Sequence, residues 1–184
     1  MAKKSSARLS FNIAFCGIMC AMSVVVMFGS LIPAFAYAVP AIAGIILWTI
    51  SEQISIKWAY LSYIAVALLS FILVPEIEAN AFFLSLFGYY PILCESLKNI
   101  KNKVVRYIIK LAVFNVTAVI TYNVLCAILS ADKMLEGMEE FGDYAVYVFW
   151  GLGLFAFIIY DLFLDVMKDL YIKVIKPKFN KLIK

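Results

Sequence analysis

The chain has 184 residues, of which 65% are hydrophobic and 15% are charged, and its mean hydropathy is +0.97. Soluble domains average about 45–50% apolar and about 25% charged residues, so this composition is typical of a membrane protein and excludes a large soluble domain. The sequence has no histidine, which excludes His-ligated metals, Ser-His or Cys-His catalytic pairs and imidazole proton relays.

Six apolar segments follow one another along the chain, and each is predicted to span a membrane as a helix. A helix needs about 20 apolar residues to cross a hydrocarbon core about 30 Å thick. The predicted spans are residues 9–28, 32–50, 58–74, 79–94, 111–129 and 144–164. The fourth is the shortest and contains Gly88 and Pro91. The predicted fold is therefore all-α, a polytopic membrane protein with six transmembrane helices in one bundle that forms a single domain, residues 1–184.

The basic residues indicate the orientation of this bundle. Fifteen of the 16 Lys and Arg residues lie before the first span, after the last, or in the second and fourth connections, and only Lys133 lies elsewhere. Lys and Arg in short loops are retained on the cytoplasmic side. Both termini are therefore predicted to be cytoplasmic, with the protein in a bacterial-type plasma membrane.

The amino terminus has an alternative interpretation as a secretory signal peptide. It has a basic start, an apolar run, and Ala34-Phe35-Ala36, which resembles a cleavage motif. The apolar run, residues 9–28, is longer than the core of a typical signal peptide, which has about 7–15 residues. An uncleaved first helix is therefore favoured.

The carboxyl-terminal tail, residues 165–184, is predicted to form a basic amphipathic helix on the cytoplasmic side. Apolar residues recur there at helical spacing beside Lys168, Lys173, Lys176 and Lys178. Such a helix is suited to the anionic lipids of the inner leaflet. It is equally suited to a cytoplasmic partner protein.

Small residues form a strip along the first span, at Ala14, Gly17 and Ala21. Small residues at this spacing let two membrane helices approach closely. The strip ordinarily serves packing inside a bundle, and the other interpretation is contact with a second membrane protein.

Four features of the chain resemble the substrate-binding S components of energy-coupling factor (ECF) transporters. They are the six-span pattern, this strip, residues 28–44 and the stretch Phe87-Gly-Tyr-Tyr-Pro-Ile-Leu93. The resemblance implies a subunit without catalysis of its own that captures a vitamin or similar micronutrient at the outer face and delivers it to the cytoplasm. It also implies a transmembrane coupling subunit and two ATPases as partners. The contacts with the coupling subunit would be Ala14, Gly17 and Ala21, although members of the family usually carry alanine at both ends of this motif, and Gly17 departs from that pattern.

Polar side chains in the outer half of three spans are the predicted contacts of a small heteroaromatic solute. Polar groups are costly in hydrocarbon unless they face a cavity or the bundle interior. The predicted contacts are Asn80, Ser85 and Tyr89 in the fourth span, Tyr122 and Asn123 in the fifth, and Tyr147 and Trp150 in the sixth. Tyr147 and Trp150 are also suited to the interfacial aromatic belt. Asn115, nearer the inner edge, is favoured as an interhelical hydrogen-bond partner.

The remaining charged residues of the spans have both structural and functional interpretations. Glu52, Lys57, Glu95 and Lys98 lie at predicted cytoplasmic turns, where they cap helices or meet a coupling subunit. Asp161 and Asp165 are one helical turn apart, a spacing suited to acid–base chemistry. Lys168 and Lys173 are close enough in sequence to favour helical ion pairs instead.

Two other functions remain open from the sequence. A small intramembrane enzyme would have Asp161 and Asp165 as its only plausible chemistry, and a membrane scaffold would need only the strip and the basic tail. The absence of histidine favours binding over catalysis. No metal, cofactor or nucleic acid is expected, and Cys16, Cys20, Cys94 and Cys126 are expected to be buried apolar thiols.

Overall fold

The computed structural model describes residues 2–129 and 144–177. The described residues are almost entirely helical and contain no strand, which confirms the all-α prediction. Contacts divide the chain into two compact units, Met1–Ile128 and Leu129–Lys184. The predicted outer loop around Lys133 and the last seven residues of the predicted tail lie outside the described residues.

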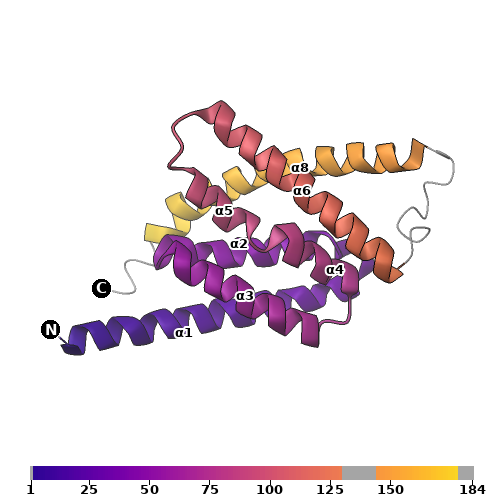
Figure 1. Cartoon of the computed structure of the whole chain (residues 1–184). Helices are drawn as coiled ribbons and strands as arrows, with labels where there is room; N and C mark the ends of the chain where they lie inside the picture. Colours follow the sequence, from indigo (N-terminus) through magenta and orange to yellow (C-terminus); the bar gives the residue numbers. More distant parts are fainter. Residues whose placement is uncertain (1, 130–143, 178–184) are drawn as a thin grey trace. The chain divides into compact units, whose positions relative to one another are not determined.

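The helical elements of the described residues follow in chain order, and Figure 1 labels the α-helices among them. They are α1 (Ala2–Met27), the 3-10 turns η1 (Phe28–Leu31) and η2 (Pro33–Phe35), α2 (Ala38–Gln53), α3 (Ile56–Leu73), α4 (Ile77–Phe82), the π-helical segment η3 (Phe83–Phe87), α5 (Tyr90–Leu97), α6 (Lys103–Leu129), α8 (Ala145–Leu170) and the π-helical segment η5 (Tyr171–Ile175). In the first unit, α1, α2 and α3 pack on one another, and α2 also packs against η3 and α5.

Five segments in the described part of the chain are long and apolar enough to cross a membrane. They are Arg8–Leu31, Ile56–Leu73, Ile77–Leu97, Lys103–Ile128 and Trp150–Val174. They correspond to the first, third, fourth, fifth and sixth predicted spans. Large apolar side chains on them face outward, as Phe71 and Ile72 do with 76% and 78% of their surface exposed. Such extensive exposed apolar surface is compatible with a multi-pass protein whose solvent is lipid.

The second predicted span, residues 32–50, is expected to be one continuous helix, and the structure differs from this. Its helix, α2, begins only at Ala38 and has 16 residues. At about 1.5 Å per residue it is about 24 Å long, shorter than a hydrocarbon core of about 30 Å. The preceding chain folds into η1 and η2 instead, and Pro33 opens η2. Pro40 does not interrupt α2, because it lies in the first turn, where backbone N–H groups have no helical partner.

The fourth segment crosses the first unit as a broken helix. Its two α-helical parts, α4 and α5, are separated by η3 and by a turn at Gly88 and Tyr89. Pro91 explains the break, since it has no N–H to donate to the carbonyl of Phe87 four residues earlier. The N–H of Gly88 donates to the oxygen of Phe83, five residues earlier, at 2.8 Å. This segment has the largest buried share of the five, 50%, and therefore forms much of the core of the first unit.

Candidate functional site

Tyr63 on α3 stabilises the break in the fourth segment. Its hydroxyl donates a hydrogen bond to the carbonyl oxygen of Leu84 at 2.6 Å. The N–H of Gly88, which would bond that oxygen in a regular helix, donates to Phe83 instead. An unsatisfied carbonyl is costly in hydrocarbon, so the tyrosine hydroxyl supplies the missing donor. The Tyr63 ring also covers Gly88, where an added Cβ would lie 2.6 Å from the ring carbon Cε2.

Gly44 on α2 approaches the same break from its own helix. A Cβ added to Gly44 would collide with the carbonyl oxygen of Phe87 and would lie 3.4 Å from Cα of Gly88. Glycine is required for an approach this close between two backbones. It places a Cα–H group beside the carbonyl of Phe87, to which Pro91 cannot donate. The position of the break is therefore set by two neighbouring helices, α2 and α3.

Aromatic rings surround the break. The ring centroid of Tyr63 lies 5.9 Å from that of Phe83 and 5.9 Å from that of Tyr89, the second pair at an edge-to-face angle of 64°. Tyr37, which precedes α2, meets Phe82 edge to face with centroids 5.2 Å apart. Such aromatic pairs add stability beyond the area that they bury. They also offer flat faces on which a heteroaromatic ring could stack.

The three predicted solute contacts of the fourth segment lie in three successive pieces of it. Asn80, in α4, is 8% exposed, and its Nδ2 donates to the carbonyl of Val74 at 2.8 Å, which anchors the connection from α3. Its Oδ1 is buried and has no donor among the described residues. Ser85, in η3, donates to Phe82 in the same segment at 3.5 Å. Tyr89, in the turn before α5, is half-buried. Of these three, Asn80 offers a buried acceptor that a ligand could satisfy.

Tyr122 and Asn123 lie near the end of α6 and differ in exposure. Tyr122 is half-buried, whereas Asn123 is exposed. The Nδ2 of Asn123 donates to the carbonyl of Val119 on its own helix at 2.7 Å. Phe114 and Leu125, which are buried, lie on the other face of α6. A role for Asn123 as a solute contact therefore stays a prediction that its orientation does not support.

Tyr147 and Trp150 lie on α8, in the second unit. Tyr147 is 75% exposed and Trp150 is half-buried. High exposure of a tyrosine near the end of an apolar helix is typical of an interfacial aromatic belt. Their participation in a site with Asn80 stays a prediction.

The strip of small residues lies on an exposed face of α1. Ala14, Gly17 and Ala21 are all exposed, and a Cβ added to Gly17 would meet no atom within 4 Å in the described part of the chain. The helix buries a different face, which includes Phe15 and Val24. The strip is therefore free of the packing inside the first unit that such a pattern ordinarily serves.

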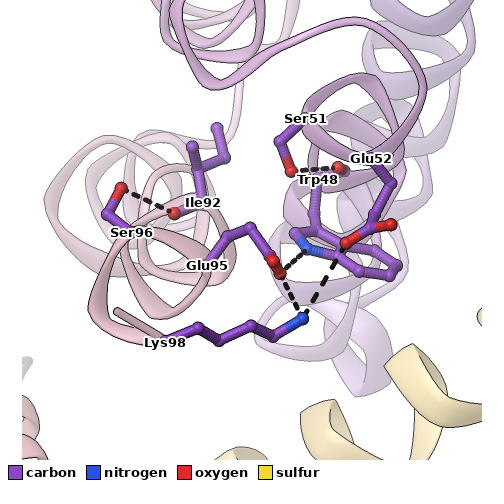
Figure 2. Close-up of polar contacts among 7 residues, drawn as sticks. All are labelled: Trp48, Ser51, Glu52, Ile92, Glu95, Ser96 and Lys98. Atoms are coloured by element: carbon purple, nitrogen blue, oxygen red, sulfur yellow. Dashed lines mark hydrogen bonds and ion pairs between the residues drawn. The ribbon is translucent and has the colours of Figure 1, made fainter. Parts of the chain in front are cut away.

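A charged cluster joins the ends of α2 and α5 (Figure 2). The indole of Trp48 is fully buried, and its Nε1 donates to Oε2 of Glu95 at 3.0 Å. The ammonium of Lys98 lies 2.8 Å from the same oxygen and 3.8 Å from Oε1 of Glu52. The two carboxylate side chains are only 11% and 15% exposed, against 45% for Lys98. The cluster confirms that Glu52, Glu95 and Lys98 lie at one end of the unit, as their predicted place at cytoplasmic turns requires.

Three residues at these contacts were not predicted from the sequence. Gly44, Trp48 and Tyr63 each lie within an apolar run, where glycine and aromatic residues are common. The sequence feature that points to Gly44 and Tyr63 is Pro91, because a proline inside a span cannot donate to the carbonyl four residues earlier, and a neighbouring helix must supply contacts there.

The cysteines are free thiols, and one acidic residue of α8, Asp169, forms an ion pair in the described residues. Cys16 and Cys94 are buried, Cys20 and Cys126 are half-buried, and all four are free thiols. No group of three His, Cys, Asp or Glu side chains within the described ranges is placed to hold a metal ion. Asp169 pairs with Lys173 one turn later at 3.7 Å, and both side chains are exposed. This is a helical ion pair of the predicted kind.

No known protein family, curated protein or solved structure matches this chain.

Proposed function

We propose that this protein is the substrate-binding subunit of an ECF-type importer. It binds a vitamin or similar micronutrient at the outer face of a bacterial-type plasma membrane and delivers it to the cytoplasm. Two ATPases and a transmembrane coupling subunit supply the energy, and this chain has no catalytic role. In this proposal the chain crosses the membrane six times with both termini inside, and η1, η2 and α2 together form the second crossing.

The exposed strip on α1 is the observation that carries this proposal. A membrane helix ordinarily turns its small residues toward its neighbours, because they permit close backbone contact. Here Ala14, Gly17 and Ala21 face outward, and Gly17 has open space around it. The strip therefore supports a contact with a second membrane protein, and the coupling subunit is the partner that the ECF resemblance implies.

The broken fourth segment supports a solute site in the same subunit. Interrupted membrane segments commonly line solute sites in transporters, because their backbone departs from a regular helix where a ligand binds. Around this break lie the rings of Tyr63 and Tyr89, and α4 carries the buried acceptor of Asn80. We propose a planar solute with an N–H or O–H donor that reaches Asn80 Oδ1, with Ser85 and Tyr89 as further contacts.

The charged cluster supports two crossings, by α3 and the fourth segment, between the ends of α2 and α5. It brings the carboxyl ends of α2 and α5 to one side of the first unit. An even number of crossings between two helix ends returns the chain to the same side. The cluster is therefore consistent with a cytoplasmic position for the basic connection after α5.

The proposal is tested by exchanging Gly17 for leucine. Tagged wild-type protein is expected to co-purify with two ATPases and a coupling subunit, and Gly17→Leu is expected to lose them, because the added side chain separates the helices. Gly151→Leu is the matched control, since a Cβ at Gly151 also meets no atom within 4 Å. An unchanged complex in Gly17→Leu would contradict the role of the strip.

A second measurement tests the solute site directly. Mass spectrometry of the purified protein is expected to detect a retained small heteroaromatic molecule. If no member of a vitamin panel is retained or binds on addition, the solute-binding role is wrong.

A further inference from the structure

The two faces of α6 differ in chemistry. One face buries Phe114, Thr121 and Leu125. The opposite face is exposed and carries Ala112, Asn115, Val119 and Asn123, which recur at spacings of three and four residues and are here called the amide face. Both asparagines lie inside Lys103–Ile128, a segment long and apolar enough to span a membrane. Two amides are therefore directed outward from the same side of an apolar helix.

These amides are only partly satisfied within the described residues. Nδ2 of Asn115 donates to the carbonyl of Leu111 at 2.8 Å, and Nδ2 of Asn123 donates to that of Val119 at 2.7 Å. An asparagine amide has two N–H donors and an acceptor oxygen. In each residue one N–H and Oδ1 thus remain available. Polar groups exposed to hydrocarbon are costly, and they drive association with another helix that can pair with them.

The spacing of the amides selects the kind of partner. Eight residues separate Asn115 from Asn123, which places the two side chains about 12 Å apart along the helix. A partner helix must therefore present a polar group at each of two depths. A second copy of this chain has the same orientation in the membrane, and a two-fold axis along the membrane normal sets each residue beside its own counterpart. An amide is complementary to another amide, because Oδ1 of one accepts from the N–H of the other.

The amide face also carries one small residue. Ala112 lies three residues before Asn115, and a small residue at a helix interface lets the backbones approach. We propose that this protein forms a two-fold symmetric dimer in the membrane, in which the amide faces of two α6 helices pack on each other. The dimer does not depend on the proposed transport role, and it gives Asn123 a role other than the predicted solute contact.

The test counts copies of the full-length protein in a bilayer. The labelled protein is diluted in vesicles of phosphatidylcholine and phosphatidylglycerol at three to one, and energy transfer between copies is measured against protein density. The double variant N115L/N123L is expected to raise the dissociation constant of the dimer at least about tenfold, because two interhelical amide pairs of average strength amount to about that factor. The variant N115Q/N123Q keeps both amides and is expected to keep the dimer. Ala65→Leu, at an exposed position on α3, controls for an added leucine and is expected to have no effect.

Three results would overturn the proposal: a wild-type protein that is monomeric at every density, an unchanged dimer in N115L/N123L, or a dimer lost equally in Ala65→Leu. The single variant Asn115→Leu, which leaves the predicted solute contact Asn123 unchanged, is expected to weaken the dimer and to retain solute binding and ATPase co-purification. Loss of the dimer is thereby distinguished from failure of the transport proposal.

Cross-linking identifies what covers the face even if the double variant folds poorly. In a chain whose four native cysteines are replaced by alanine, Val119→Cys is expected to form a disulfide with the same residue of a second copy. Thr121→Cys, on the buried face, is expected to form none. A Val119→Cys cross-link to α8 of the same chain, to a different protein, or to nothing would overturn the proposal.

Discussion

At the scale of single residues, the break in the fourth segment results from Pro91 and from the groups that replace its missing donor. Pro91 has no N–H to donate to the carbonyl of Phe87, and the N–H of Gly88 donates to Phe83 instead of to the carbonyl of Leu84. Gly44 lies against the first carbonyl and the Tyr63 hydroxyl bonds the second. An interruption that would be costly in lipid is thus stabilised by side chains of two other helices.

Gly44→Ala is expected to destabilise the protein strongly. The added methyl group would collide with the Phe87 carbonyl, which belongs to the backbone and cannot rotate away. Overpacking of this kind costs about 1–3 kcal/mol. The measurement is the midpoint of thermal unfolding in detergent. Gly151→Ala is the matched control and is expected to leave the midpoint unchanged or to raise it slightly, since its Cβ enters open space and alanine favours a helix. Equal effects of the two substitutions would contradict the close contact.

Tyr63→Phe is expected to cost about 1–3 kcal/mol, because it removes the hydrogen bond to Leu84 and leaves that carbonyl, in a segment apolar enough to span a membrane, without its donor. The ring and its contact with Gly88 are retained. Tyr60→Phe removes a hydroxyl from the same helix, and no hydrogen bond of that hydroxyl is found within the described residues. Thermal unfolding of both variants is the measurement, and a loss in Tyr60→Phe as large as that in Tyr63→Phe would show that the Leu84 bond is unimportant.

At the scale of elements, α2 contacts the fourth segment along one face. Gly44, Trp48 and Glu52 are four residues apart and therefore share a side of α2. Along this side a backbone contact is followed by the hydrogen bond to Glu95 and then by the ion pair with Lys98 (Figure 2). The contact becomes more polar toward the end of the helices, where water is available to charged groups.

Glu95→Ala is expected to destabilise the protein more than Glu52→Ala. Loss of Glu95 leaves the N–H of the fully buried Trp48 without its acceptor, at a cost of about 1–3 kcal/mol. Glu52 lies 3.8 Å from a lysine that is 45% exposed, so its pair with Lys98 contributes about 0–1 kcal/mol. Unfolding midpoints of the two variants provide the measurement. The reverse order would show that Glu52, rather than Glu95, joins the two helices.

At the scale of the whole molecule, the arrangement of basic residues determines the expected orientation. The five candidate spans leave the crossing by residues 32–50 undecided, because α2 alone is shorter than the hydrocarbon core. With six crossings, the basic segments all face the cytoplasm. With five, the basic residues before the first span could not lie on the same side as those after α5 and those of the tail. The charge distribution therefore favours six.

Reporter fusions measure this orientation. Green fluorescent protein fused to either terminus is expected to fluoresce, since it folds in the cytoplasm. Alkaline phosphatase inserted after Lys133 is expected to be active, because it folds only outside. An inactive phosphatase at Lys133, or a dark fusion at one terminus alone, would show that the number of crossings is not six.

The sequence by itself determined the all-α class and the position of five candidate spans, and it predicts the orientation from the basic residues. These follow from local composition, because the length of an apolar run and the charge of its flanks do not depend on packing. The sequence also has Gly88 and Pro91 in its shortest predicted span, where the structure has the interruption, since proline acts on its own helix.

Only the tertiary structure decided which residues repair that interruption and which faces remain free. Gly44, Tyr63 and Trp48 act on residues 21 to 47 positions away in the chain. Their partners depend on how helices pack, and no local pattern contains that information. In the same way, the outward direction of Gly17 and Asn123 follows from which face of each helix the others bury.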